Sequence, residues 1–265
     1  MTPFSNRPLV AVDVGNSRIK LGVFDASSKI DLPEPSRFAV LAPDLTAAEI
    51  ERFLSGDPSE FDWSIASVNR PSEGRLREWL AGRNAKGVQT LKHTDLPLVV
   101  DVARPDRVGI DRLADAVAVN RLRDPRRAAI VIDIGSAIKV DLVTQRGSFA
   151  GGAILPGIAM SARALHEFTD LLPLIEANEA PPVLGTSTES AMRSGLYWGA
   201  LGGARELVTL LAAEHGVKQI FLTGGGAPNL TGIVDHLPQL HLRSVPHLTL
   251  SGIAISAVHC SAAKE

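Results

Sequence analysis

Several residue types and segments are scarce in this chain, and each scarcity excludes a class of protein. Cys260 is the single cysteine, so the sequence predicts neither an internal disulfide framework nor a cysteine metal cluster. No apolar run approaches the length of about 18 residues that a membrane span needs. Residues 1–8 lack the charged and apolar regions of a secretory signal peptide. We therefore expect a cytoplasmic protein with no membrane-bound part.

Charge of one sign is also scarce. The chain carries 27 Lys and Arg against 29 Asp and Glu, a formal net charge of -2, and it has no basic block. Nucleic-acid-binding proteins carry basic patches, so we expect no nucleic-acid partner. The seven histidines show no metal-ligand spacing, and we expect His236, His241 and His247 to lie at the surface.

The length and composition are those of a globular protein. The chain has 265 residues, 45% of them hydrophobic and 21% charged, which is enough to bury a substantial core. This length fits one large domain or two small ones.

The most informative stretch is 9–24, L-V-A-V-D-V-G-N-S-R-I-K-L-G-V-F. Two apolar runs flank a polar corner, which predicts a β-hairpin. The corner offers backbone N–H groups, the Ser17 hydroxyl and the nearby ammonium of Lys20, which suit phosphate oxygens, while Asp13 suits the accompanying metal. An ordinary hairpin with a polar turn explains this segment alone equally well.

A second stretch repeats this pattern about 120 positions later. Residues 129–143 read A-I-V-I-D-I-G-S-A-I-K-V-D-L-V, with the same Asp-x-Gly-small corner at Asp133, Gly135 and Ser136. Two copies of one unit indicate a duplicated fold.

This duplication resembles the acetate and sugar kinase, heat-shock and actin superfamily. The resemblance implies an α/β protein with a duplicated actin-like (ribonuclease H-like) fold, in which each half has a mixed sheet and a cleft lies between the halves. We expect the halves to span 1–124 and 125–265. The charged segment 121–127, R-L-R-D-P-R-R, is interpreted as the solvated connector between them.

The segment 101–120 predicts a loop followed by a helix from Ile110. Asp111 and Arg112 then lie in the first helical turn. The helix dipole alone favours an acid such as Asp111 at this place, but it disfavours a cation. A bidentate pair with a carboxylate would explain the presence of Arg112.

At this point the chain resembles one family, the type III pantothenate kinases, over nearly its whole length. Five motifs carry the resemblance, in the family's order: D-V-G-N-S at 13–17, G-I-D-R at 109–112, D-I-G-S-A at 133–137, G-G-A-I-L-P-G at 151–157 and T-G-G-G-A at 223–227. Each motif alone is weak evidence, and the five together are strong.

The resemblance implies a role for each matching residue. Asp111 is the implied catalytic base, Asp13 the Mg²⁺ partner and Asp133 the ligand of a monovalent cation, K⁺ or NH₄⁺. The implied pantothenate contacts are Val102, Gly109, Ile110, Asp111, Arg112 and Thr188. The implied ATP contacts are Asp13, Val14, Gly15, Asn16, Ser17, Arg18, Ile19, Lys20, Ser136, Gly224 and Gly225. Thr188 also suits a helix N-cap, and both roles are compatible.

Two residues of the second corner depart from the family pattern. Ser136 replaces the usual threonine but keeps the hydroxyl. Lys139 stands where the family more often has a small hydroxyl residue; it adds a charge near the phosphates or points to the far face of the sheet, and the sequence does not choose.

Glycines mark two further features. Gly151 and Gly152 remove side chains where a backbone or ligand must approach closely. Gly195, Gly199, Gly202 and Gly203 give the predicted helix from Thr188 to His215 a small-residue face. Close packing would compensate for their helical cost, and we expect a homodimer.

The resemblance implies an enzyme that uses ATP to phosphorylate pantothenate, the first step of coenzyme A synthesis. The alternatives are another small-molecule kinase or phosphatase of the superfamily, and an inactive regulatory protein on the same fold. The G-I-D-R motif argues against the first, and the intact acids at 13, 111 and 133 argue against the second.

Overall fold

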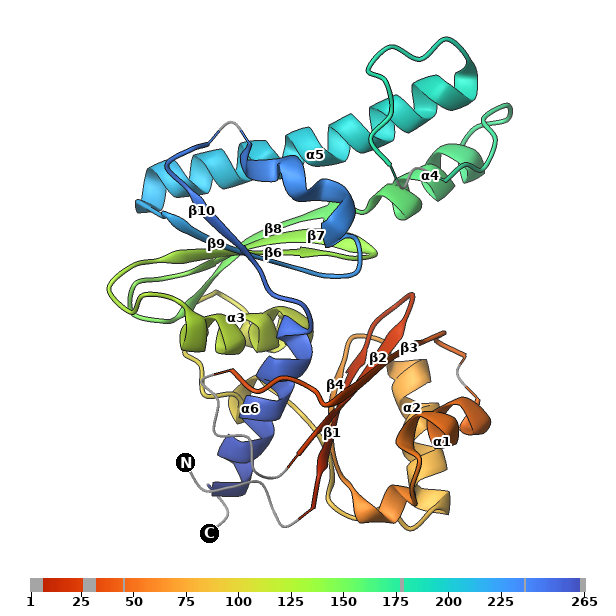
Figure 1. Cartoon of the computed structure of the whole chain (residues 1–265), viewed down its shortest axis with the longest axis vertical. Helices are drawn as coiled ribbons and strands as arrows, with labels where there is room; N and C mark the ends of the chain where they lie inside the picture. Colours follow the sequence, from red (N-terminus) through yellow and green to blue (C-terminus); the bar gives the residue numbers. More distant parts are fainter. Residues whose placement is uncertain (1–6, 26–31, 45, 177–178, 236, 263–265) are drawn as a thin grey trace. The chain divides into compact units, whose positions relative to one another are not determined.

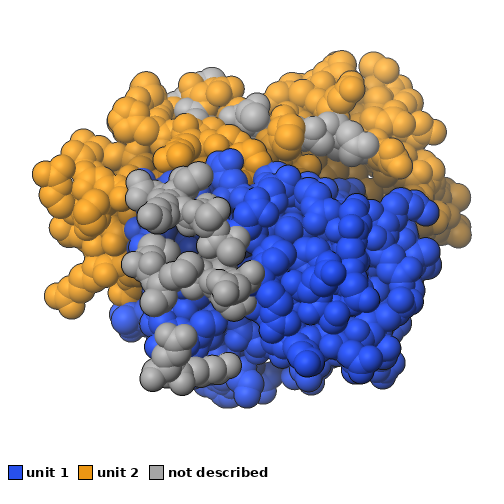
Figure 2. All heavy atoms as spheres, turned by 60° about the horizontal axis from the view of Figure 1, so that its bottom comes forward, with its two compact units in different colours: residues 1–122, 247–265 blue, residues 123–246 orange. Residues whose placement is uncertain are grey.

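The computed structural model describes residues 7–25, 32–44, 46–176, 179–235 and 237–262, without the side chains of residues 229–231 and 234. The chain divides into two compact units, residues 1–122 with 247–265 (unit 1) and residues 123–246 (unit 2), coloured separately in Figure 2. The predictions for the first six residues and for His236 fall outside the described residues.

In its described part, unit 1 contains a mixed sheet of five strands in the order β3-β2-β1-β4-β5. The strands are β1 Leu9–Val14, β2 Ile19–Phe24, β3 Arg37–Leu41, β4 Asp62–Ser67 and β5 Val88–Thr90. β1 pairs antiparallel with β2 and parallel with β4, so it is central and buried throughout.

Helices cover both faces of this sheet (Figure 1). The helices are α1 Ala47–Leu54, α2 Arg70–Gly82, α3 Ile110–Leu122 and α6 Leu248–Ala262, with short 3₁₀ helices at Pro58–Glu60, His93–Asp95 and Pro105–Arg107. Alternate β1 residues, Val10 and Val12, pack with Ile50 of α1 and Leu76 of α2. α3 and α6 lie side by side and contact β4.

Unit 2 repeats this arrangement. Its described sheet has the order β10-β9-β6-β7-β8, so that β6 to β10 correspond one by one to β1 to β5. The strands are β6 Ala129–Ile134, β7 Ala137–Val143, β8 Phe149–Pro156, β9 Gln219–Thr223 and β10 His241–Ser244. β6 again pairs antiparallel with one neighbour and parallel with the other. The predicted duplicated α/β fold with a mixed sheet in each half is confirmed.

The core of unit 2 lies between its sheet and one long helix. The helical segments are α4 Ile158–Glu167, α5 Thr188–His215 and a 3₁₀ helix Ala227–Val234. Ile130, Ile132 and Ile134 of β6 face Leu201 and Val208 of α5. The alternate β6 residue Asp133 therefore points to the other face of the sheet, because successive side chains of a strand alternate.

Local signals set several element boundaries. A capping box of Thr46 and Glu49 begins α1, and the predicted limits of α5, Thr188 to His215, agree with the structure. The N-cap of α5 is Ser187, however, which pairs with Ser190; Thr188 is the first helical residue, so the N-cap prediction for Thr188 is wrong.

The chain divides differently from the expected halves. The first boundary lies after Leu122, near the expected 124, but residues 247–265 belong to unit 1. The physical reason is that α6 packs along α3 and β1, with Leu250, Ile253 and Ala254 fully buried. No helix in the described part of the chain is long and apolar enough to cross a membrane.

Candidate active site

The first corner links β1 to β2 in unit 1. Its turn is closed by a 3.0 Å hydrogen bond from the Gly15 amide to the Arg18 carbonyl, and Asn16, Ser17 and Arg18 are exposed. Asp13 and Lys20 are directly opposed on the two strands, and Lys20 Nζ lies 3.1 Å from Asp13 Oδ2. Asp13 is a buried carboxylate held by a cation, beside an exposed loop of polar groups.

The loop after β4 adjoins this corner. The Val68 amide donates to the Val14 carbonyl at 3.0 Å, and Asn69 Nδ2 donates to the Gly15 carbonyl at 3.4 Å. Asn69 also caps α2, because its Oδ1 accepts from the Ser72 amide. The parallel pairing of β1 with β4 brings these two loops to one edge of the sheet.

The G-I-D-R segment begins α3 close to the same loop. The Gly109 carbonyl accepts from the Arg112 amide at 3.1 Å, and Asp111 is buried in the first turn. A Cβ at position 109 would lie 2.5 Å from Asp111 Oδ1 and 3.6 Å from Val68 Cγ1. The absence of a side chain at Gly109 therefore lets the Asp111 carboxylate fold back over the loop.

A second acid follows one helical turn later. Asp115 is 2% exposed and accepts a 2.8 Å hydrogen bond from Thr249 of α6. Sequence analysis missed Asp115, although its i, i+4 spacing from Asp111 places both acids on one helix face.

The second corner, in unit 2, is approached closely by glycines from two other segments, Gly157 after β8 and Gly224 after β9. A Cβ at Gly157 would lie 2.6 Å from the carbonyl oxygens of Gly135 and Ser136, and one at Gly224 would lie 2.4 Å from Asp133 Oδ1. Gly224 has a φ of 96°, which favours glycine. The close approach expected at Gly152 is confirmed, because a Cβ there would meet the Val140 carbonyl at 2.2 Å.

Lys139 belongs to this corner. It directly opposes Asp133 in the β6–β7 ladder, and its Nζ lies 2.5 Å from Asp133 Oδ2. Of the two alternatives for Lys139, the structure therefore supports the charge beside the corner. Asp133 Oδ1 is buried and has no hydrogen-bond partner among the described residues.

The remaining predicted residues lie on loops and element ends. Val102 is half-buried before the 3₁₀ helix Pro105–Arg107, and Thr188 is exposed at the start of α5. Val14, Ile19 and Ile110 are buried in unit 1, Ser136 is half-buried, and Gly225 is exposed after β9. Within unit 1 the structure brings together the first corner and Gly109–Asp111; within unit 2 it brings together Asp133, Ser136 and Gly224.

His247 is a further residue that sequence analysis misjudged. It is half-buried at the start of α6 and stacks against Phe38 with ring centroids 4.0 Å apart, whereas His241 is exposed as expected. Burial lowers the pKa of His247 below its ordinary value of 6.5, against an opposing effect of Glu34, and the cation of Lys20 lowers it further.

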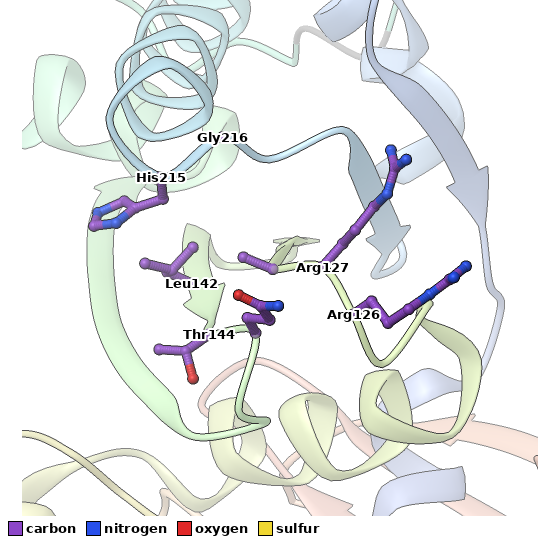
Figure 3. A pocket seen from close by; sticks show the side chains of 8 residues that line it. Arg126, Arg127, Leu142, Thr144, His215 and Gly216 are labelled. Atoms are coloured by element: carbon purple, nitrogen blue, oxygen red, sulfur yellow. The ribbon is translucent and has the colours of Figure 1, made fainter.

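A separate hollow in unit 2 lies at the other end of the central strands. Its volume is about 220 Å³. Figure 3 shows the residues that line it, Arg126, Arg127, Ala128, Leu142, Thr144, Gln145, His215 and Gly216. Arg126 and Arg127 pair with Asp124, and Arg123 donates to the Arg127 and Gln145 carbonyls. These contacts make the segment an ordered turn at the unit boundary, remote from the second corner.

The fit of a divalent metal was judged from the donor groups. No cluster of three or more His, Cys, Asp or Glu that could hold a metal occurs in the part of the chain that the structure describes. Mg²⁺ is commonly bound by one or two carboxylates together with substrate phosphates, and the buried Asp13 beside a polar corner fits that mode.

Comparisons with known proteins agree with this geometry. A model of the type III pantothenate kinase family matches residues 9–209. The type III pantothenate kinase of Legionella pneumophila (strain Corby) is 33% identical over 94% of this chain and 98% of its own, and that of Chlorobium luteolum is 29% identical over 91% and 92%.

Solved structures share the fold at low identity. The activator of the 2-hydroxyisocaproyl-CoA dehydratase from Clostridium difficile, solved with bound ADPNP, has a TM-score of 0.54 and 12% identity over 97% of both chains. Component A of the (R)-2-hydroxyglutaryl-CoA dehydratase of Acidaminococcus fermentans has a TM-score of 0.50 and 15% identity over 98% of this chain and 100% of its own.

The matched span 9–209 includes both Asp-x-Gly corners and the G-I-D-R turn that begins α3. With this span and the relatives' near-complete coverage, the chain belongs to the type III pantothenate kinase family.

Proposed function

We propose that this protein transfers the γ-phosphoryl group of ATP to the primary hydroxyl of pantothenate, forming 4'-phosphopantothenate and opening coenzyme A synthesis. The observation that carries the proposal is the family match over 9–209, which spans both corners and the buried Asp111. Kinases of this family use ATP with a divalent metal. A cytoplasmic location, where ATP is the abundant phosphoryl donor, belongs to the same proposal.

The first corner binds phosphate oxygens. Asn16, Ser17 and Arg18 are exposed in this corner, which adds the Ser17 hydroxyl and the Lys20 ammonium to the backbone of the loop. Asp13 is the Mg²⁺ partner, and the metal supplies charge neutralisation on the phosphates when it is bound. Phosphoryl transfer needs positioning and charge stabilisation more than covalent chemistry, so a rigid corner on a central strand suits it.

Asp111 accepts the proton of the attacking hydroxyl. The new bond joins the pantothenate oxygen to the γ-phosphorus, the bond from that phosphorus to the β–γ bridging oxygen breaks, and ADP leaves with the bond's electron pair. The nearly complete burial of Asp111 and its support by Gly109 hold the carboxylate in one position. A positioned base contributes about 10²–10⁴-fold to the rate.

Arg112 holds the carboxylate of pantothenate through a two-pronged contact. It is half-buried in the first turn of α3, directly after Asp111, and its guanidinium can present two parallel N–H donors to a carboxylate. We assign further pantothenate contacts to Val102, Gly109, Ile110 and Thr188, as the family resemblance implies.

The second corner also contacts ATP in this proposal. Ser136 offers a hydroxyl and Gly224 and Gly225 offer backbone without side chains, which we assign to ATP. By the family resemblance Asp133 is the expected ligand of K⁺ or NH₄⁺, and we propose that a monovalent positive charge beside this buried carboxylate is part of the site.

A homodimer completes the proposal. Gly195, Gly199 and Gly202 on α5 have open space where a Cβ would stand. Large apolar side chains are exposed around α4 and the loop before α5, namely Phe168, Leu171, Leu174, Val183 and Leu184. Exposed apolar patches of this kind mark protein interfaces. Light scattering of wild type and Gly199→Leu tests this: a monomeric wild type excludes it.

The function is tested by incubating the protein with ATP, Mg²⁺ and pantothenate in the presence of K⁺. ADP release in a coupled assay and phosphopantothenate by mass spectrometry are expected. Acetate and a panel of sugars and hydroxy acids serve as competing substrates. Preferred phosphorylation of one of these, or no ADP release with any, would overturn the proposal.

A further inference from the structure

The corner of unit 2 already contains a monovalent cation that is part of the chain. Lys139 Nζ lies 2.5 Å from Asp133 Oδ2, and the two side chains are only 16% and 7% exposed. Their strands are adjacent and their positions directly opposed, so the contact follows from the β6–β7 register and not from a flexible surface approach.

Unit 1 contains the same Lys–Asp pair between adjacent strands. Lys20 directly opposes Asp13 in the β1–β2 ladder, and its Nζ lies 3.1 Å from Asp13 Oδ2. Each Asp-x-Gly corner thus has its acid at the end of the central strand and its lysine at the matching place on the return strand. The repetition argues that the Lys139 contact is a built feature of this chain.

The residues at Asp133 do not fit an additional free monovalent cation. One carboxylate carries one negative charge, and the Lys139 ammonium balances it at 2.5 Å with the lysine only 16% exposed. The Lys20–Asp13 contact is longer, 3.1 Å, and its lysine is 26% exposed, so that corner still suits a divalent metal that arrives together with substrate phosphates. A second cation on Asp133 Oδ1 would stand close to the ammonium, in a buried place where like charges repel strongly. Asp133 Oδ1 is buried and has no hydrogen-bond partner among the described residues, and Gly224 packs so closely against it that a Cβ there would lie 2.4 Å away.

We propose that the Lys139 ammonium takes the place of the free monovalent cation, so that this protein binds nucleotide and turns over without K⁺ or NH₄⁺. This inference rests on the proposed function. Because the ammonium is covalently attached to the chain, it does not have to bind from solution, and it stays in place at any salt composition. Like a fixed positive group in a water-poor site, it stabilises phosphate charge without reorganisation.

The first experiment uses the wild-type protein, with ATP, Mg²⁺ and pantothenate in a Tris buffer freed of K⁺ and NH₄⁺. Adding either ion up to physiological concentration should change kcat and the KM for ATP by less than about twofold. The reason is that neither the substrate complex nor the transition state gains a bound ion. An activation of tenfold or more by K⁺ would show that the ion fills a vacant site. That result would overturn the inference and leave the proposed function intact.

The second experiment recreates the free site. Lys139→Thr removes the ammonium, and threonine is favoured in strands. Without K⁺ the variant should lose roughly 10²-fold in kcat, the scale of removing one electrostatic contact, and K⁺ or NH₄⁺ should restore most of it. Lys218→Thr is the matched control, an exposed lysine of the same unit, and it should remain insensitive to K⁺. A Lys139→Thr variant that behaves like wild type in both buffers would overturn the inference.

An equilibrium readout separates failure of the inference from failure of the proposed function. The melting temperature and the Kd for ADP with Mg²⁺ are measured against K⁺ for wild type and both variants. Only Lys139→Thr should be stabilised by K⁺ and bind the nucleotide more tightly in it. If no substrate is phosphorylated in any salt, the proposed function fails, yet this titration still decides whether Lys139 replaces the ion. K⁺-dependent melting of wild type would contradict the inference.

Discussion

Thr249 Oγ1 donates a 2.8 Å hydrogen bond to Asp115 Oδ1, joining two helices of unit 1 across 134 positions of sequence. Both residues are buried, at 4% and 2% exposure. The bond connects α6, at the end of the chain, to the helix whose first turn carries Asp111 and Arg112. It therefore couples the stability of the C-terminal helix to the placement of the candidate base.

Thr249→Val should test that coupling. Valine keeps the shape but removes the donor, and a hydrogen bond to a charged group contributes about 1.5–3 kcal/mol to stability. Urea unfolding should show this loss. Thr209→Val, which removes a hydroxyl contact within α5, should change stability by less than about 0.5 kcal/mol. Equal losses in the two variants would mean that the Asp115 bond has no special weight.

Asp111→Asn tests the proposed base. The amide cannot accept the hydroxyl proton, so kcat should fall by about 10²–10⁴-fold while the melting temperature stays close to that of wild type. Asp106→Asn is the control, because Asp106 is an exposed acid of the preceding 3₁₀ helix. A variant that keeps near wild-type kcat would reduce Asp111 to a favourable charge at a helix N-terminus.

Arg112→Lys tests the proposed carboxylate clamp. An ammonium does not reproduce two parallel hydrogen bonds, so the KM for pantothenate should rise while kcat changes little. The KM for ATP serves as the internal control. Unchanged kinetics for both substrates would show that Arg112 is a helix residue without a substrate contact.

Gly109→Ala tests whether the missing side chain positions the base. The new Cβ would stand 2.5 Å from Asp111 Oδ1, so the carboxylate must move. We expect a loss in kcat that approaches the effect of Asp111→Asn. Gly74→Ala, in α2 with open space around the new methyl, should instead stabilise the protein by about 0.5–1 kcal/mol. Full activity of Gly109→Ala would show that Asp111 needs no such support.

His247 predicts a dependence of stability on pH. Its pKa is lowered in the folded state, chiefly by burial. The unfolded chain therefore takes up the proton first as pH falls below about 6.5, and the free energy of unfolding decreases until the folded pKa is reached. Above pH 6.5 the full contribution is present.

The measurement compares melting temperatures between pH 5 and 7.5. His247→Asn should flatten part of the decline on the acid side, and asparagine tolerates the left-handed backbone at this position, where φ is 61°. His259→Asn, at an exposed place on α6, controls for loss of a histidine. The same pH profile in wild type and His247→Asn would rule out this cause.

Much of the fold was predictable because its signals are local. Thr46 and Glu49 satisfy each other and the first turn of α1, and Gly216 ends α5 in a left-handed conformation. Each depends on residues within a few positions. By contrast, β10 has little apolar character and is a strand because it pairs with β9, so no local pattern announces it.

The sequence by itself determined the duplicated corners, the family resemblance and the candidate acids Asp13, Asp111 and Asp133, since each is written in a short contiguous motif. Only the tertiary structure decided that Lys139 lies on Asp133 and that Thr249 holds Asp115. It also decided that α6 belongs to the first unit. Strand register sets the first of these, and packing between distant helices sets the other two. Strand register and helix packing both join residues from different elements, so local sequence patterns do not reveal them.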